Sequence, residues 1–203
     1  MHISTLRKLI PYTTTDLRVC FYNAFILPHL TYSSSVWALK NKLQMETLFC
    51  LQKRTIRLIM NAPYISHTLP FFKRLGLLPI TFAIKIRKLS LVYKCLYSLA
   101  PDYLCSKFSF VTSSTRRGSS KILFVPVHTG MSSKSFTISG ARLWNSLPED
   151  IRTAESLLTF KFLLKKAVLN KINEIHSWDD LWCTSCSIDF QLSCFFCPHI
   201  SNF

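Results

Sequence analysis

An apolar side chain recurs every three or four residues along one segment of the chain, at Phe82, Ile86, Leu89, Tyr93 and Leu96. This spacing places the five side chains on one face of an α-helix. Such a face must be buried against other helices or against a sheet. The pattern is the strongest secondary-structure signal in the sequence, and it predicts a long helix that begins at Ile80.

Similar periodicity predicts further helices over residues 15–28, 30–39, 42–60, 68–75, 141–147 and 156–169. The first has Leu17, Phe21 and Ala24/Phe25 on one face. We expect it to end at Pro28, because proline has no N–H to donate. Gly76 is expected just past the end of the helix that begins at Thr68, and Ser156 is expected to cap the last helix.

The composition changes after Pro101. Residues 109–140 are rich in Ser, Thr and β-branched side chains. Two segments in this region, KILFVPVHT (121–129) and SKSFTIS (133–139), predict short strands with Gly130 between them. Pro126 makes the first of these an edge strand or an irregular extension.

Charge is unevenly distributed along the 203 residues, whose formal net charge is +15. All 25 Lys and Arg lie in residues 1–172 beside six acidic residues, which gives this part +19. Residues 173–203 contain four acidic residues and no Lys or Arg, so their charge is −4. Most basic side chains therefore have no acidic partner in the chain. This favours the phosphate backbone of RNA or DNA as the counter-charge, bound independently of sequence and sensitive to salt.

The basic residues fall into several clusters. In the helix at 42–60, the expected core stripe is Leu48, Leu51, Thr55 and Leu58/Ile59, with three cations opposite. The candidate phosphate-binding residues are Lys53, Arg54, Arg57, Lys85, Lys88, Arg116, Arg117, Lys121, Lys161 and Lys165. The alternative for any one cluster is an ordinary solvated helix face. The aromatic residues near them can stack on bases or pack in the core: Tyr64, Phe71, Phe72, Tyr93 and Tyr97.

The sequence offers little for catalysis. Asp179-Asp180 is an adjacent carboxylate pair, but no strand pattern precedes it, and a solvated loop is the simpler interpretation. Glu149-Asp150 follows Pro148, where carboxylates stabilise the first turn of a helix. With four glycines in the whole chain, we find no phosphate-cradling loop. We therefore expect no enzymatic activity from the chain as it stands.

Eight cysteines are present, and the first residues lack the apolar segment and small-residue cleavage site of a secretory signal. We therefore expect reduced thiols or metal ligands in an intracellular protein of the cytoplasm or nucleus. Two CxxC pairs near the end are spaced to hold Zn²⁺, with Cys183, Cys186, Cys194 and Cys197 as candidate ligands. The alternative is a Cys- and Phe-rich terminus without metal.

The longest uncharged run, Val19 to Leu39, is long enough to span a bilayer. It contains Asn23, Pro28, His29 and three consecutive serines at 33–35. We expect a buried helical hairpin there and no membrane contact, since these polar positions disfavour a membrane span.

Several segments follow one another in a distinctive order: FYNAFILPHLTYSSSVW (21–37), LQKRTIRLIMNAPYISHTLPFFKRLGLLP (51–79), YKCLYSLAPDY (93–103), SFTISGARLWNSLPEDIR (135–152) and FKFLLKK (160–166). In this order they resemble the C-terminal part of the reverse transcriptases of non-LTR (LINE-type) retrotransposons. The resemblance extends from about Leu6 to Leu169, which is most of the chain.

The resemblance implies a helical thumb followed by a connector, the part of such polymerases that grips the primer–template duplex by its backbone. We expect a mainly α fold: a thumb-like helical domain at 1–108, a connector with a small β-hairpin and a terminal amphipathic helix at 109–172, and an irregular acidic, Cys-rich tail at 173–203. Lys53, Arg54 and Arg57 are then expected to face nucleic acid. The parent family is an RNA-directed DNA polymerase whose catalytic aspartates belong to a palm upstream of Met1. The expected function is therefore binding by a fragment that lacks the palm.

Two alternatives stay open. The chain can be the end of a longer, active reverse transcriptase, with palm and fingers upstream and a misassigned start. It can also be a zinc-dependent module that binds nucleic acid or protein. Some relatives carry a Cys/His knuckle near the C-terminus, but the spacing CxxC-x7-CxxCxH here differs from the usual one.

Overall fold

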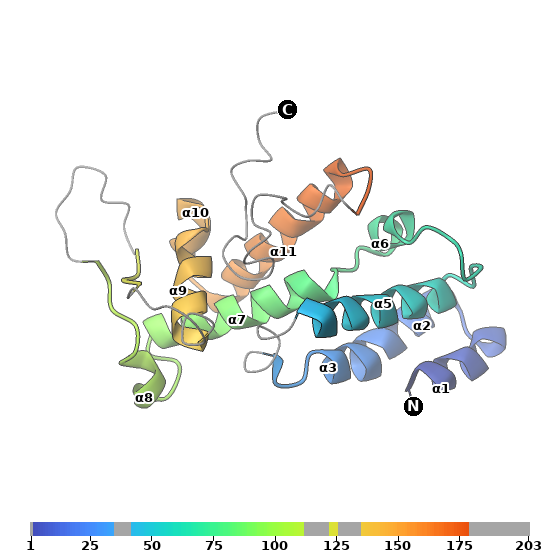
Figure 1. The fold of residues 1–203 in the computed structure, drawn as a ribbon, viewed down its shortest axis with the longest axis horizontal. Helices are drawn as coiled ribbons and strands as arrows, with labels where there is room; N and C mark the ends of the chain where they lie inside the picture. The colour runs from blue at the N-terminus through green and yellow to red at the C-terminus, as the bar shows by residue number, and fades with distance from the viewer. Residues whose placement is uncertain (1, 35–41, 112–121, 126–134, 179–203) are drawn as a thin grey trace. The chain divides into compact units, whose positions relative to one another are not determined.

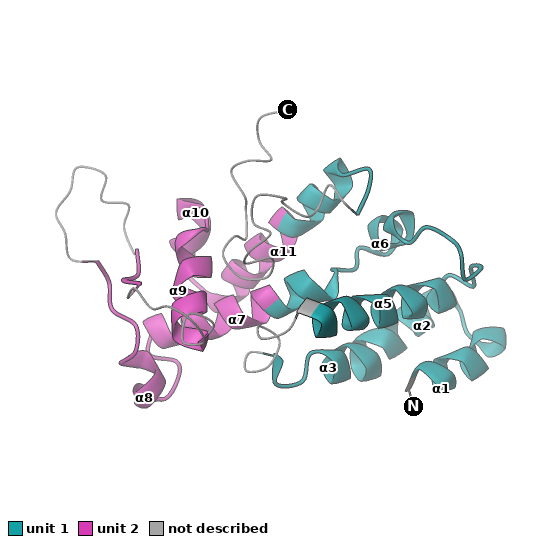
Figure 2. Ribbon diagram, viewed as in Figure 1, with its two compact units in different colours: residues 1–84, 168–181 teal, residues 85–167, 182–203 magenta. Residues whose placement is uncertain are grey.

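The structure is a computed structural model, and it describes residues 2–34, 42–111, 122–125 and 135–178. Within these ranges the protein is mainly α-helical, as the sequence predicts. Two compact units are formed, one by residues 1–84 with 168–181 and the other by 85–167 with 182–203 (Figure 2). We call them unit 1 and unit 2. Their boundaries fall inside the helices α7 (Ile80–Leu96) and α11 (Leu157–Glu174), and they differ from the boundaries expected at 108 and 172.

Unit 1 begins with helices whose course departs from the prediction at Pro28. After α1 (His2–Leu9) and the 3₁₀ turn η1 (Ile10–Tyr12), α2 (Thr15–Phe21) runs through the π-helical turn η2 (Tyr22–Ile26) into α3 (Leu27–Leu30). The predicted end at Pro28 is therefore wrong. The wider π turn, in which Leu27 N–H bonds the carbonyl of Tyr22, precedes the proline and accommodates its missing donor. A second helix was expected at residues 30–39. The structure has α3 ending at Leu30, and residues 35–39 lie outside the described ranges.

The central helix of unit 1 is α5 (Lys42–Ile59), which packs against α1, α2 and α6 (Leu69–Leu75) (Figure 1). Its position in the sequence is as predicted, but its buried stripe is not. The buried side chains are Met45, Phe49, Gln52, Thr55, Ile56 and Ile59, whereas Leu48, Leu51 and Leu58 are half-buried. The observed stripe is therefore rotated from the predicted one, and it includes the buried polar side chain of Gln52.

Gln52 is fully buried, and its amide is satisfied on both sides. The nitrogen donates to Tyr22 Oη and to the carbonyl of Leu78, each at 2.8 Å, and the oxygen accepts from Ile80 N–H at 2.7 Å. Buried polar groups are tolerated when they are paired in this way. One side chain of α5 thus fixes both the π turn and the first residue of α7.

The last described residues complete unit 1. The indole of Trp178 meets Phe49 and Phe72 edge-on, at ring-centroid distances of 5.1 and 5.0 Å, and donates from Nε1 to Thr68 Oγ1 at 3.2 Å. Lys73 donates to the carbonyls of Asn173 and Ile175 at 3.0 and 2.8 Å, where α11 ends. A cation at this position also complements the helix dipole.

Unit 2 contains the rest of α7, then α8 (Asp102–Cys105), α9 (Phe136–Asn145), α10 (Glu149–Arg152) and the first part of α11. Its core is aromatic: Tyr93, Trp144 and Phe160 contact one another at centroid distances of 4.8 to 6.4 Å. Tyr93 Oη donates to the carbonyl of Ala154 at 3.0 Å, so the buried hydroxyl is paired. As predicted, Glu149 and Asp150 occupy the first turn of α10, and Ser156 Oγ accepts from Thr159 N–H at the start of α11.

The predicted strand at 133–139 is wrong, because α9 begins at Phe136. Ser135 caps it by accepting a hydrogen bond from Ile138 N–H, and Ile138, Ala141 and Trp144 then recur at helical spacing on the buried side. Of the other predicted strand only residues 122–125 are described, and they contain a single antiparallel bridge between Leu123 and Phe110. The amide of Asn145 bonds both backbone groups of Leu123, in the way that a neighbouring strand does.

Candidate nucleic-acid interface

The basic character of the chain is strongest around α5 to α7. Residues 47–101 contain nine Lys and Arg and no Asp or Glu. Within this segment, Lys53, Arg54 and Arg57 lie on the C-terminal half of α5, where Arg54 is exposed and the other two are half-buried. The nearest acidic residue in the sequence is Glu46, which lies seven residues before Lys53 in the first half of α5.

The end of α5 is fixed by its backbone. Asn61 has a φ of +49°, and its N–H bonds the carbonyl of Leu58 at 3.1 Å while Ala62 N–H bonds that of Arg57 at 2.9 Å. These two bonds form the Schellman arrangement, which ends a helix on a left-handed residue. Asparagine tolerates this conformation better than most side chains do. The chain therefore leaves the helix in one defined direction.

A tight turn follows at residues 63–66, in which Ser66 N–H bonds the carbonyl of Pro63 at 3.1 Å. Arg57 donates from Nε to the carbonyl of Ser66 at 2.9 Å and ties the turn to the helix. Tyr64 and Ile65 occupy the two central positions, and their side chains are 69% and 89% exposed. The turn thus presents two large apolar side chains to solvent.

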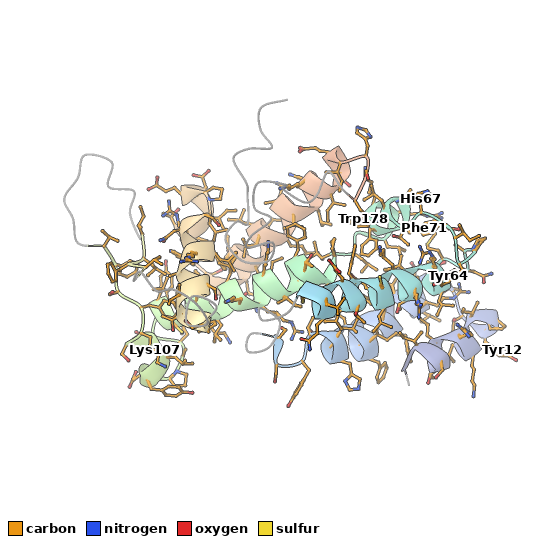
Figure 3. The ribbon with its side chains drawn as sticks, in the orientation of Figure 1. Tyr12, Tyr64, His67, Phe71, Lys107 and Trp178 are labelled. Carbon is orange, nitrogen blue, oxygen red and sulfur yellow. The ribbon has the colours of Figure 1, made fainter. Side chains whose placement is uncertain are left out.

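Two guanidinium groups flank the ring of Tyr64. Those of Arg54 and Arg57 lie 5.7 and 5.6 Å from the ring centroid, within the range of cation–π attraction. Arg54 also donates to Tyr64 Oη at 3.3 Å. Figure 3 shows Tyr64 beside the C-terminal end of α5. We call Lys53, Arg54, Arg57, Tyr64 and Ile65 the α5 surface.

Lys53 is the third cation of this surface, with its ammonium 4.7 Å from the centroid of Phe49. Other cations of unit 1 serve the fold. Arg18 donates to the carbonyls of Ile59, Ile10 and Thr13, and Lys73 caps α11 as described above. Arg18 and Lys73 are thus held by backbone carbonyls of unit 1, whereas Arg54 is exposed and Arg57 combines a carbonyl contact with partial exposure.

Lys88 must be removed from the predicted phosphate contacts. It is completely buried in unit 2, where Nζ donates to Ser139 Oγ and lies 5.8 Å from the centroid of Phe136. Burial lowers the pKa of the Lys88 ammonium to about 7, since a charge loses its hydration there. A side chain with no exposed surface cannot reach a phosphate. Its helix neighbour Lys85 is half-buried.

A second exposed cationic stripe lies in unit 2, on the first half of α11. Lys161, Lys165 and Lys166 are exposed there, together with Leu158 and Phe162, whose side chains are 79% and 64% exposed. The predicted residues Arg116, Arg117 and Lys121 lie outside the described ranges, as do the four cysteines proposed as zinc ligands. Among the residues that the structure describes, no group of three or more His, Cys, Asp or Glu is placed to hold a metal ion.

The five aromatic residues predicted to stack on bases differ in how far they are buried. Phe72 and Tyr93 are in the cores, Phe71 is half-buried, and Tyr97 is 36% exposed with its ring stacked on that of Tyr93. Tyr64 is the most exposed of the five. Ile65 was not among the predicted site residues, although it lies two positions after Pro63, and proline is frequent in turns.

Within the described residues, every helix is too short or too polar to cross a bilayer. Comparison with protein-family models, with curated proteins and with solved structures found no match to this chain.

Proposed function

We propose that this protein binds RNA or DNA through the phosphate backbone, with the α5 surface as a principal contact in unit 1. The observation that carries the proposal is the set of exposed Arg54 and half-exposed Lys53 and Arg57 in a segment without acidic residues. Cations in such a setting release counterions from nucleic acid, and this release drives binding independently of sequence. Lys161 and Lys165 provide a second exposed contact in unit 2.

We further propose that the chain derives from the thumb and connector of a non-LTR retrotransposon reverse transcriptase. The ordered motifs between Leu6 and Leu169 support this origin, and so does the mainly helical fold. In this proposal the chain contributes binding and not catalysis, and it acts inside the cell, where such nucleic acid is found. A polymerase palm upstream of Met1 is the partner that the resemblance implies if the chain belongs to a longer protein.

The direct test is the salt dependence of affinity. Fluorescence anisotropy with a labelled RNA–DNA hybrid, measured between 50 and 300 mM KCl, gives the slope of log K against log salt; these concentrations are about the range over which such slopes are resolved. Several phosphate contacts predict a slope corresponding to more than about two released ions. A smaller slope, or no binding, refutes the proposal.

Matched variants locate the contact. Lys53→Gln/Arg54→Gln removes two charges from the α5 surface, and Arg7→Gln/Lys8→Gln removes two exposed charges from α1 in the same unit. Both doublets lower the net charge by two. We expect only the first to reduce the salt slope, by roughly 1.4 to 1.8, because each lost phosphate contact removes about 0.7 to 0.9. Equal losses in both variants would show attraction by total charge alone.

A further inference from the structure

Two adjacent large apolar side chains, Tyr64 and Ile65, are exposed at the centre of the turn at 63–66. Central turn positions usually carry Gly, Pro, Asn, Asp or Ser, because these residues favour the required backbone angles or hydrogen-bond the turn. An exposed tyrosine followed by an isoleucine that is 89% exposed leaves apolar surface in water. Such a pair at a defined position suggests that something covers it in the functional state.

The turn is held in place before any ligand arrives. The Schellman end of α5, the bond from Ser66 N–H to the carbonyl of Pro63, and the bond from Arg57 Nε to the carbonyl of Ser66 fix its backbone. Arg54 holds the hydroxyl of Tyr64. Because these groups are already ordered, binding costs little further conformational entropy at this turn.

The chemistry around the ring identifies the ligand class. Tyr64 is 69% exposed, although two guanidinium groups lie 5.7 and 5.6 Å from its ring centroid. A flat, electron-rich group can stack on this ring while an attached anion is attracted by Arg54 and Arg57. A nucleotide combines these two features in one unit, a planar base and a phosphate.

The pairing state of the base follows from geometry. Within a duplex, each base has both faces covered by its neighbours in the stack, so a protein ring can reach only edges and backbone. An unpaired base exposes a face that can stack on an aromatic side chain. We infer that the turn at 63–66 is a stacking site for an unpaired nucleobase, with Tyr64 as the platform and Arg54 and Arg57 beside its phosphate. This inference rests on the proposed nucleic-acid binding and adds a preference for single-stranded segments.

The test compares a labelled single strand of about 20 thymidines with a duplex of equal length, a size that spans several nucleotide-binding sites. Tyr64→Leu keeps an apolar side chain but removes the ring, and Tyr64→Phe keeps the ring without the hydroxyl. Tyr12→Leu is the control, since Tyr12 is another exposed tyrosine of unit 1, 84% exposed. Thermal unfolding of each variant verifies that the fold is kept.

We expect Tyr64→Leu to weaken single-strand binding by about 5- to 100-fold, the range for loss of one base–aromatic stack, and to change duplex binding by less than about twofold. Tyr64→Phe and Tyr12→Leu should stay close to the wild type on both probes. If Tyr64→Leu loses the same affinity for the single strand and the duplex, or loses none for either, the stacking inference is wrong. The proposed backbone binding is judged separately, by the salt slope of the wild type. Unchanged nucleic-acid affinity with reduced self-association of Tyr64→Leu would also overturn it and assign the turn to a protein contact. If the wild type binds neither probe, the proposed function itself is refuted.

Discussion

The side-chain nitrogen of Gln52 donates a hydrogen bond to the hydroxyl of Tyr22 at 2.8 Å, and both side chains are buried in unit 1. The same amide bonds the carbonyl of Leu78 and the N–H of Ile80. Burial raises the pKa of Tyr22 to about 12, although the bond with Gln52 opposes this rise. The helix that presents Arg54 and Arg57 is therefore positioned by one neutral polar network.

Replacing Gln52 by leucine should lower the free energy of unfolding by roughly 2 to 4 kcal/mol, because the buried hydroxyl, carbonyl and N–H that it serves all lose their partner. Urea denaturation measures this change. Tyr22→Phe is the matched control, since it leaves both backbone bonds of Gln52 in place and should cost about 1 kcal/mol. A leucine variant as stable as the phenylalanine variant would show that the backbone groups do not depend on Gln52.

Lys88 makes stability depend on pH. Its pKa is lowered from 10.5 to about 7 in the folded protein, so between these values the unfolded chain binds a proton that the folded chain has lost. The free energy of unfolding should therefore rise as pH increases from 7, with a slope of at most about 1.4 kcal/mol per pH unit. Urea denaturation between about pH 7 and 9 measures the slope, in the region where this lysine titrates.

Lys88→Met is the control for that slope, because it keeps a buried chain of similar length without an amine. The variant should show a flat profile across the same interval. Above pH 9 a second group opposes the trend: burial raises the pKa of Cys95 from 9.0 to about 11, so its contribution is present below pH 9 and is lost as pH rises further. A slope that persists in Lys88→Met between pH 7 and 9 would attribute it to another group.

Two helices end on a residue in the left-handed conformation. At such a position we expect glycine to be tolerated and alanine to lower stability. Asn61 has a φ of +49° and Gly76 a φ of +59°. Asn61→Gly should leave stability unchanged or raise it by a few tenths of a kcal/mol, whereas Asn61→Ala and Gly76→Ala should each lower it by about 1 kcal/mol. Thermal unfolding of the three variants is sufficient. An Asn61→Ala variant as stable as the wild type would mean that the end of α5 is not held in this conformation.

The parts of the fold that were predicted correctly depend on residues close together in the sequence. The positions of α5, α6, α7 and α11 follow from helical spacing, from Pro70 and Gly76 at the two ends of α6, and from Ser156 before α11. The missed features depend on contacts distant in sequence or on unusual backbone. Pro28 normally ends a helix, and only the π turn before it allows continuation. The segment 133–139 alternates as a strand does, but Ser135 caps it as a helix whose apolar residues pack in unit 2.

The candidate site was predictable in part for similar reasons. Charge counting pointed to Lys53, Arg54 and Arg57, and the structure exposes or half-exposes all three. The same count could not exclude Lys88, since its neighbours Ser139 and Phe136 are about fifty residues away along the chain and decide its burial. Nor could it reveal that Arg54 and Arg57 flank Tyr64, because that relation depends on the Schellman end of α5 and on the turn after it.

The apolar face predicted for residues 15–28 is not covered within the described part of unit 1. Leu17 and Phe25 are 57% and 52% exposed, and the ring of Phe21 lies against that of Phe25 at 4.9 Å. An exposed apolar face of this kind favours self-association. Leu17→Gln/Phe25→Gln should therefore reduce association in sedimentation velocity and lower the binding of a hydrophobic dye. It should change the free energy of unfolding by no more than about 0.5 kcal/mol, because more than half of each side chain is already exposed to solvent.

Leu158→Gln/Phe162→Gln provides the comparison, since these two side chains are also exposed but belong to α11 in unit 2. If only the Leu17→Gln/Phe25→Gln variant reduces association, the face of Leu17 and Phe25 is the contact. If both variants reduce self-association equally, association depends on the total exposed apolar area, and neither face is a specific contact. A wild-type protein that is monomeric and does not bind the dye would contradict the prediction.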